Sequence, residues 1–288
     1  DTSAGPSPTV GTMHSRVSGY RDSLGEFPAV ALSEEIETPG PGRVRALFTV
    51  AGNPTLSIPN GRRLAKAIAT LDLYVAIDMY RNATTRLAHY ILPPTGPLER
   101  DHYGLGLLPS AVRNFAHYSE PMIQPAPDAL HDWQILRGLA TAISGKAFTA
   151  PPPHVVIDGM LARGPYKLSL EQLRAHPSGM DLGPCSGDML PQRIRTASGR
   201  IECAPQEFLQ AIARVHPPTV EADGRLFLIS RRHARSNNSW LGNSHRLVKG
   251  AERCTMQINP ADAAERRLAD GAQAVVVHRD RSIRVTVA

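Results

Sequence analysis

Two short groups of residues early in the chain have the side chains that a nucleotide site needs. The first is Gly52, Asn53 and Pro54, which follow the apolar segment 44–51, and the second is Asp78, which ends another apolar segment. Glycine lets the backbone approach a ligand closely, an asparagine amide donates and accepts hydrogen bonds, and a carboxylate accepts two N–H groups of a guanine. Ordinary turn residues and a capping aspartate explain the same letters, because a GNP sequence is a weak signal by itself.

Further polar residues extend this pattern. Asn82 and Thr84 follow within one turn of Asp78 and can donate hydrogen bonds to phosphate or sugar oxygens. The segment SRRHARSNNSW at 230–240 concentrates arginines, whose forked guanidinium groups suit phosphate, and asparagines, which suit heterocycle edges. A basic surface loop explains this segment equally well. Its candidate binding residues are Arg231, Arg232, His233, Ser236, Asn237 and Asn238.

A strand–helix–strand unit is expected to position the first residues. The segment 44–51 predicts a strand, and residues 62–71 predict a helix whose apolar residues recur at helical spacing. The run LYVAI at 73–77 predicts a second strand, covered on both faces as in a parallel sheet. Ligands of open parallel sheets bind beyond the carboxyl ends of the strands. The expected buried face of the helix is Leu64, Ile68 and Leu71.

Later elements are shorter and more interrupted. A short helix and a third strand are expected before the double proline at 93–94, and a helix is expected over 128–144 with Asp128 as its cap. Residues 145–224 are proline-rich and predict an irregular connection. The apolar stripe of the 128–144 helix is Leu130, Trp133, Leu136, Leu139 and Ile143.

After residue 224 the pattern changes to that of an all-β unit. Alternating or apolar runs predict several short strands, and the last of them alternates strictly between apolar and polar residues. Asn259 is expected to cap one short helix that ends near Gly271. The strands are expected at 225–230, 254–258, 274–278 and 283–288, which are few for closing a barrel.

Composition narrows the class of protein but not its ligand. The 288 residues are 42% hydrophobic and 20% charged, which is typical of globular proteins, and no apolar run is long enough to span a membrane. A net charge of +6 attracts nucleic acid, an acidic partner or a ligand with several phosphates. The three cysteines are far apart, which excludes a self-contained iron–sulfur or zinc motif here and favours a reducing, cytoplasmic compartment.

Three stretches of the sequence resemble one enzyme family. The stretch from GNPTLSIPNG through LDLYVAIDMYRNATTRLAHYILPPTGPLERDHY resembles the second half of the dinucleotide-binding α/β domain of molybdopterin oxidoreductases, the superfamily of dimethyl-sulfoxide reductase and formate dehydrogenase. GPYKLSLEQLRAHPSGMDLGP and RIRTASGRIECAPQEF resemble the bridge before its last domain. The stretch beginning RLFLISRRHARSNNSW resembles the start of the molybdopterin-dinucleotide-binding β-barrel.

The resemblance implies a fold class and domains. The fold is expected to be α/β, with a Rossmann-like parallel sheet as part of a doubly wound domain, followed by an incomplete β-barrel domain. The expected domains are residues 1–150 (α/β), 151–222 (a proline-rich connection) and 223–288 (part of the barrel). The chain would then be a fragment of a longer enzyme and inactive alone.

The resemblance also implies roles for the candidate residues. Gly52, Asn53, Pro54 and Asp78 would hold the guanosine end of one molybdopterin guanine dinucleotide, with Asn82 and Thr84 in the adjoining turn. The six candidates of the 230–240 segment would surround pterins and pyrophosphates. Ala83 and His89 depart from the family pattern, which has Glu and Asp at these places.

The implied protein is a molybdenum- or tungsten-dependent oxidoreductase of the formate-dehydrogenase or nitrate-reductase type, with bis-molybdopterin guanine dinucleotide. Its metal ligand and a [4Fe–4S] cluster are expected only in an N-terminal part outside these residues, so no catalytic or metal-binding residue is assigned here. The expected partners are the remainder of the enzyme, a small-molecule substrate and an electron-transfer partner, without nucleic acid. The alternative is a non-catalytic module that binds nucleic acid or another polyanion. His102 is more simply a structural histidine.

Overall fold

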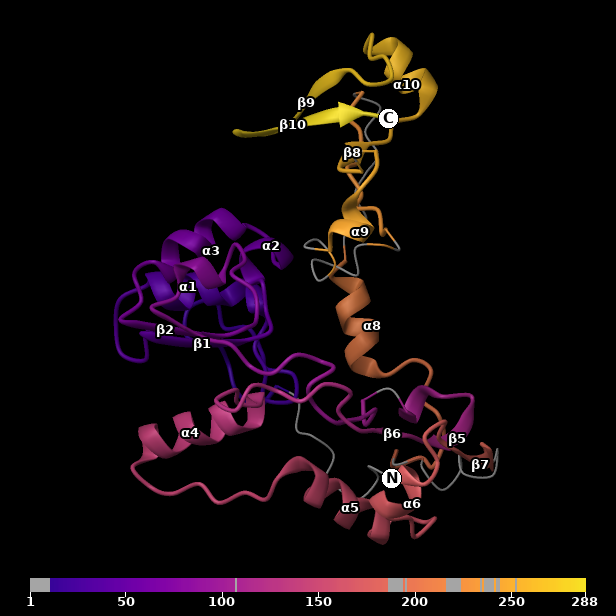
Figure 1. The fold of residues 1–288 in the computed structure, drawn as a ribbon. Helices are drawn as coiled ribbons and strands as arrows, with labels where there is room; N and C mark the ends of the chain where they lie inside the picture. Colours follow the sequence, from indigo (N-terminus) through magenta and orange to yellow (C-terminus); the bar gives the residue numbers. More distant parts are fainter. Residues whose placement is uncertain are drawn as a thin grey trace. The chain divides into compact units, whose positions relative to one another are not determined.

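The computed structural model separates the chain into two compact units, residues 1–226 and residues 227–288. Figure 1 shows the elements of both. The structure describes residues 11–106, 108–185, 194, 196–215, 224–233, 235, 241, 244–251 and 253–288.

A parallel three-stranded sheet with the order β1-β2-β3 forms the centre of the first part of the chain. Its strands are β1 (Ala46–Val50), β2 (Leu73–Ile77) and β3 (Tyr90–Leu92). The short helix α2 (Pro54–Ser57) and the helix α3 (Gly61–Ile68) connect β1 to β2, which confirms the predicted strand–helix–strand order. The chain therefore has a mixed α/β structure.

Helices α1 (Leu32–Glu37) and α3 lie on one side of β1 and β2 (Figure 1). All three predicted apolar residues of the α3 region are buried, and they pack with Ile36 of α1 and with Tyr74 and Ala76 of β2. Full burial of each large aliphatic side chain contributes about 1.5–3 kcal/mol. The phenol of Tyr74 is satisfied inside this core, because its oxygen lies 3.0 Å from the Thr49 hydroxyl on β1.

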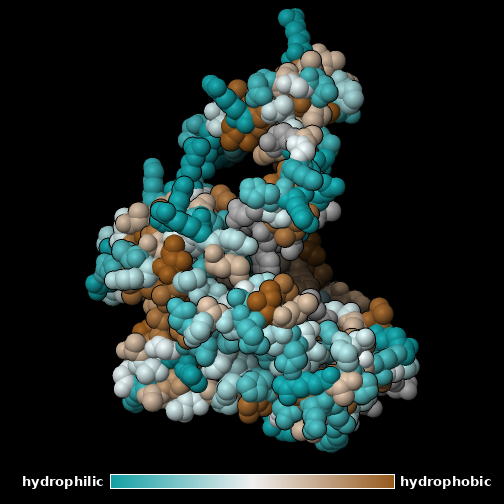
Figure 2. All heavy atoms as spheres, viewed as in Figure 1, coloured by the Kyte–Doolittle hydropathy of each residue, from teal (hydrophilic) through white to brown (hydrophobic). Residues whose placement is uncertain are grey.

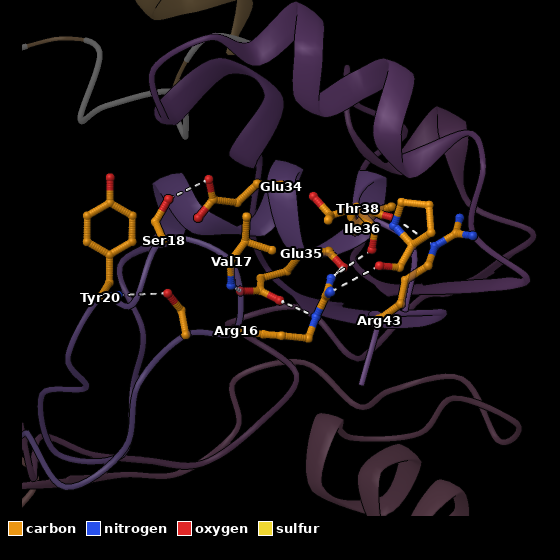
Figure 3. A network of polar contacts seen from close by, with 11 residues as sticks. Arg16, Val17, Ser18, Tyr20, Glu34, Glu35, Ile36, Thr38 and Arg43 are labelled. Atoms are coloured by element: carbon orange, nitrogen blue, oxygen red, sulfur yellow. Dashed lines mark hydrogen bonds and ion pairs between the residues drawn. The ribbon is translucent and has the colours of Figure 1, made fainter. Parts of the chain in front are cut away.

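Two arginines satisfy the carboxyl end of α1, where backbone carbonyls have no partner inside the helix. Figure 3 shows Arg16 reaching this end from the preceding loop. Its guanidinium donates to the carbonyl oxygens of Thr38 at 2.8 Å and Glu35 at 3.3 Å, and to the Glu35 carboxylate at 3.2 Å. Arg43 Nε donates to the carbonyl of Ile36 at 2.7 Å. These bonds tie the N-terminal loop to the helix that covers the sheet.

The part after β3 is more regular than the sequence predicted. Ala116 and Tyr118 form a second small core with Leu168, Leu170 and Leu173, so part of the expected irregular connection packs into the fold. Pro153 stands at the first turn of a helix, where its missing N–H costs nothing. The elements after β3 are β4 (His102–Tyr103), η3 (Leu108–Ser110), β5 (Arg113–Ala116), β6 (Tyr118–Ser119), α4 (Asp132–Ser144), α5 (Pro153–Arg163), α6 (Leu170–Arg174), β7 (Met180–Pro184) and α8 (Gln206–Ala213), while the short helix η2 (Thr85–Leu87) lies between β2 and β3. β4 pairs with β6, and β5 pairs with β7, both antiparallel.

The prediction for α4 was wrong in its cap and in its buried face. The helix begins at Asp132 with His131 as the preceding residue, whose backbone N–H donates to the Gln134 side chain at 2.8 Å. Ile135 is its buried residue, while Leu136 and Ile143 are 43% and 71% exposed. Apolar residues lie on several sides of this helix, so their spacing did not identify one face. Figure 2 shows further apolar side chains at the surface among hydrophilic ones.

The second unit contains a three-stranded sheet with the order β8-β10-β9. β10 (Arg281–Val287) pairs antiparallel with β9 (Gln273–His278) and parallel with β8 (Thr255–Met256). Asn259 caps α10 (Pro260–Glu265) as predicted, because its side chain accepts a hydrogen bond from Ala261 N at 2.9 Å.

Two expectations for this second unit were wrong. Residues 225–230 form no strand, and the unit is not all-β, because it holds α9 (His245–Val248) as well as α10. The described residues of the unit form no closed barrel, and an incomplete barrel is not confirmed. Among all described residues, no helix has the length and apolar character to cross a membrane.

Candidate functional site

The two groups of polar residues found in the sequence lie next to each other at one edge of the parallel sheet. Val50 at the end of β1 is in register with Ile77 at the end of β2, and Ala51 N donates to Ile77 O at 2.9 Å. The chain therefore leaves both strands side by side, toward Gly52 on one strand and Asp78 on the other. Asp78 is only 9% exposed. This arrangement is the strand-end geometry in which ligands of parallel sheets bind.

The carboxylate of Asp78 is held in one orientation by two internal hydrogen bonds. Its Oδ1 accepts from Tyr80 N at 2.9 Å, and its Oδ2 accepts from the Asn82 amide at 3.0 Å. A carboxylate has about four lone-pair positions, so each oxygen retains capacity for another donor. The side chain is thus both fixed and able to accept a ligand.

Asn82 has a structural role in this turn. Its Oδ1 accepts from the backbone N–H groups of Thr84 and Thr85, both at 2.9 Å, and so satisfies two donors at the start of the short helix η2. Its Nδ2 donates to Asp78, as described above. The Thr85 hydroxyl closes the turn, because it accepts from Asn82 N at 2.8 Å and donates to Tyr80 O at 2.9 Å. Asn82 therefore serves mainly to orient Asp78.

Thr84 joins the two loops. Its side chain is fully buried, and its hydroxyl donates to Asn53 Oδ1 at 2.7 Å. The same oxygen accepts from Thr55 N at 3.1 Å and lies 2.8 Å from the Thr55 hydroxyl. A buried hydroxyl with these partners has no surface to offer a phosphate. The structure therefore places Thr84 behind the candidate site and leaves Asn53, on the other loop, nearer to solvent.

The two glycines of the loop after β1 are present for different reasons. A Cβ on Gly61 would lie 1.8 Å from the carbonyl oxygen of Thr55, so packing of α3 against α2 requires glycine there. A Cβ on Gly52 would make only ordinary contacts at 3.7 Å, and its backbone lies outside the left-handed region. Nothing within the described chain therefore requires glycine at position 52, whereas a closely approaching ligand would.

The second candidate cluster lies in the other unit and is described only in part. Arg231 and Arg232 are exposed, and His233 is half-buried with its Nδ1 accepting from Arg235 N at 3.1 Å. Ser236, Asn237 and Asn238 lie outside the described residues. Residues 227–288 hold eleven lysines and arginines against five acidic residues, so this unit carries the whole formal charge of +6.

Sequence reasoning missed several residues that shape the site. Thr55 and Thr85 act through hydroxyl groups whose partners are distant in sequence, and no local pattern identifies them. His89, which departs from the family pattern, accepts a hydrogen bond from Tyr74 N at 2.8 Å through Nδ1 and so provides an acceptor, as an aspartate would. His102 is exposed on β4 and pairs with Ser119, away from any of these contacts.

Comparison with known proteins decides the family. Residues 6–142 match the molybdopterin oxidoreductase family, and residues 226–288 match the molybdopterin dinucleotide binding domain. The chain belongs to the molybdopterin oxidoreductase family. Members of this family are enzymes.

Relatives of this molybdopterin oxidoreductase chain are much longer than the chain itself. It is 26% identical over 250 residues to the NADPH-Fe(3+) oxidoreductase subunit alpha of Geobacter sulfurreducens, covering 85% of this chain and 26% of that protein. It is 34% identical over 128 residues to the assimilatory nitrate reductase catalytic subunit of Bacillus subtilis, covering 43% of this chain and 17% of that protein. The solved structure of acetylene hydratase from Pelobacter acetylenicus shares the fold, with a TM-score of 0.60 and 19% identity over 90% of this chain and 37% of the other.

Proposed function

We propose that this chain supplies nucleotide-binding loops of a molybdenum- or tungsten-dependent oxidoreductase that uses bis-molybdopterin guanine dinucleotide. Gly52, Asn53 and Pro54, together with Asp78, hold the guanosine end of one cofactor molecule. The observation that carries this proposal is the fixed carboxylate of Asp78 at the end of β2, directly beside the loop that follows β1.

The chemistry of Asp78 suits guanine better than adenine. Guanine presents an N1–H and an exocyclic amine side by side, and a carboxylate can accept both. Adenine has an unprotonated N1 at the corresponding position and cannot make this pair. Each charge-assisted bond is worth about 1.5–3 kcal/mol, and the low exposure of Asp78 reduces competition from water. The internal bonds to Tyr80 and Asn82 hold the carboxylate in place before the ligand arrives.

The remaining roles divide between the cofactor and this chain. The bound cofactor would supply two-electron redox chemistry through its metal, and the protein would bind and orient that cofactor. The basic unit 227–288 provides charge for pyrophosphate through Arg231 and Arg232, with His233, Ser236, Asn237 and Asn238 in the same stretch of sequence. We propose a formate- or nitrate-type reaction on a small-molecule substrate, with the rest of the enzyme and an electron-transfer protein as partners. Any [4Fe–4S] cluster would be bound outside these residues.

Calorimetric titration of the 288-residue chain with guanosine monophosphate and adenosine monophosphate tests the nucleotide site. We expect guanosine monophosphate to bind at least about tenfold more tightly, which corresponds to 1.4 kcal/mol, and Asp78→Asn to remove this preference. Asp72→Asn is the matched control, because Asp72 precedes the same strand at its opposite end and is paired with Arg45. Equal binding of both nucleotides, or an equal effect of the two substitutions, would overturn the proposal.

The concentration of charge in the second unit also favours a second candidate function, binding of nucleic acid or another polyanion. Such binding would fall steeply with salt and would accept lysine in place of arginine. Phosphate recognition by forked guanidinium groups would not accept that exchange. Titration of the chain with a single-stranded oligonucleotide at two salt concentrations separates the two functions.

A further inference from the structure

We propose that Thr84 is a positioning residue that fixes the polarity of the Asn53 amide, so that Asn53 presents only its N–H donors to the nucleotide. The inference rests on the proposed nucleotide site and assigns a specificity role inside it. Thr84 makes no contact with the ligand itself, because its side chain is fully buried. It acts through the hydrogen bond from its hydroxyl to Asn53 Oδ1.

An exchange of capping roles at the start of α2 provides the first argument. Asn53 is the residue before the first turn of α2, and an asparagine there normally uses its own oxygen to accept from the second or third backbone N–H. Asn53 makes no such bond. Thr84 supplies the acceptor instead, since its hydroxyl oxygen accepts from Thr55 N at 3.1 Å. The Asn53 side chain is thereby released from helix capping.

Counting protons gives the second argument. A hydroxyl has one proton and two acceptor positions. The Thr84 oxygen accepts from Thr55 N, and its one proton goes to Asn53 Oδ1 at 2.7 Å, so the Thr55 hydroxyl donates across the 2.8 Å contact. Both acceptor positions of Thr84 are then filled. A flipped Asn53 amide would instead donate to this oxygen, and the Thr84 proton would turn to the Thr55 hydroxyl. The 2.7 Å separation between Thr84 and Asn53 decides between the two arrangements, because it is typical of an O–H···O bond and short for an N–H···O bond.

The remaining atom of the amide is therefore directed away from Thr84. Asn53 is half-buried, and among the described residues its Nδ2 has neither a hydrogen-bond partner nor a fully buried position. The site then offers a carboxylate that accepts, from Asp78, and an amide nitrogen that donates, from Asn53. A ligand must place donors at the first and an acceptor, such as a carbonyl or phosphate oxygen, at the second.

Titration of the 288-residue chain with guanosine monophosphate tests this inference through four variants. Thr84→Ser keeps the hydroxyl and should bind within about threefold of the unsubstituted chain, while Thr84→Val should bind at least about tenfold more weakly. Thr95→Val is the matched control, because it removes another buried hydroxyl, whose partner is His131. Asn53→Asp replaces the donor by an acceptor and should weaken binding as Thr84→Val does.

The double variant Asn53→Asp with Thr84→Val distinguishes positioning from general destabilisation. If Thr84 acts through Asn53, the double variant binds as weakly as Asn53→Asp alone, within about threefold. If the double variant instead loses the product of the two single losses in affinity, the two substitutions act independently and the inference is overturned. Weak binding by Thr84→Ser or by Thr95→Val would also overturn it. Urea unfolding of each variant confirms that the compared chains are folded.

A second readout keeps this inference separate from the proposed function. If the unsubstituted chain binds no guanosine monophosphate, the proposed nucleotide site fails, but the amide orientation can still be measured. We expect the side-chain amide resonances of Asn53 to shift in Thr84→Val and to stay in place in Thr84→Ser and Thr95→Val. Unchanged Asn53 resonances in Thr84→Val would overturn the inference whatever the binding result.

Discussion

Alanine at Gly61 and alanine at Gly52 should have opposite effects on this protein. Gly61→Ala places a Cβ 1.8 Å from the Thr55 carbonyl oxygen, whereas real contacts of this kind essentially never fall below 3.0 Å. The carbonyl or the helix must therefore move by at least 1.2 Å, the difference between these two distances. Gly52→Ala adds only contacts at 3.7 Å, which are ordinary.

The magnitudes follow from these distances. Overpacking of this kind costs about 1–3 kcal/mol, and movement of Thr55 also weakens its bonds to Thr84, each worth about 0.5–1.5 kcal/mol. We expect Gly61→Ala to lower the free energy of unfolding by about 2–4 kcal/mol. Gly52→Ala should raise it by up to about 1 kcal/mol, because alanine restricts the unfolded chain at a position whose backbone alanine can adopt.

The effect of Gly52→Ala on nucleotide affinity should differ from its effect on stability. In the proposed site the added methyl at position 52 would occupy the space through which a nucleotide approaches the backbone, so Gly52→Ala should bind guanosine monophosphate at least about tenfold more weakly, a loss of 1.4 kcal/mol. Urea unfolding followed by circular dichroism gives the stability, and calorimetric titration gives the affinity. Unchanged stability of Gly61→Ala would refute the close approach of α3 to α2, and unchanged affinity of Gly52→Ala would refute the reason given for that glycine.

Two further predictions concern the arginine cluster and the buried tyrosines. Arg231→Lys should weaken pyrophosphate binding by the chain nearly as much as Arg231→Ala, because lysine keeps the charge but loses the forked pair of donors. Full affinity of the lysine variant, measured by calorimetry, would show that Arg231 contributes only its positive charge. Burial raises the pKa of Tyr74, and burial together with the bond to Asp101 raises the pKa of Tyr118. The unfolded chain then loses these protons near pH 10 while the folded chain keeps them, so stability is complete below pH 10 and falls above it by at most about 1.4 kcal/mol per pH unit for each tyrosine. Urea unfolding at pH 9 and pH 11 should show a smaller loss for Tyr74→Phe, and an identical loss would contradict this account.

The elements that sequence alone predicted are those whose signals are local. The run at 73–77 became β2 without a change in its bounds, because a short apolar run before a polar residue has few alternatives. Asn259 and Pro260 marked the start of α10 for the same kind of reason, a cap followed by a favourable first residue.

The elements that were missed depend on contacts between distant residues. Nothing near Ile135 distinguishes it from the other apolar residues of α4, since its burial is decided by packing elsewhere in the fold. Helix α5 was hidden by prolines that break a helix in its interior but suit its first turn.

The candidate site shows the same division between local and distant signals. Asp78 and Gly52 were found because they follow predicted strands. Thr84 was expected to donate to phosphate or sugar oxygens because it follows Asp78 within one turn, but the structure buries it behind Asn53, 31 residues earlier in the chain. Only the folded arrangement of the two loops gives this threonine its role.

The central claim is that the loop after β1 and the carboxylate after β2 together bind the guanosine end of a molybdopterin guanine dinucleotide. The most direct measurement is a titration of the isotopically labelled chain with guanosine monophosphate, followed by nuclear magnetic resonance of the backbone amides. The account predicts that the largest changes fall on Gly52, Asn53 and Asp78, and that adenosine monophosphate leaves these signals in place. Changes confined to residues 227–288, or equal changes with both nucleotides, would contradict it.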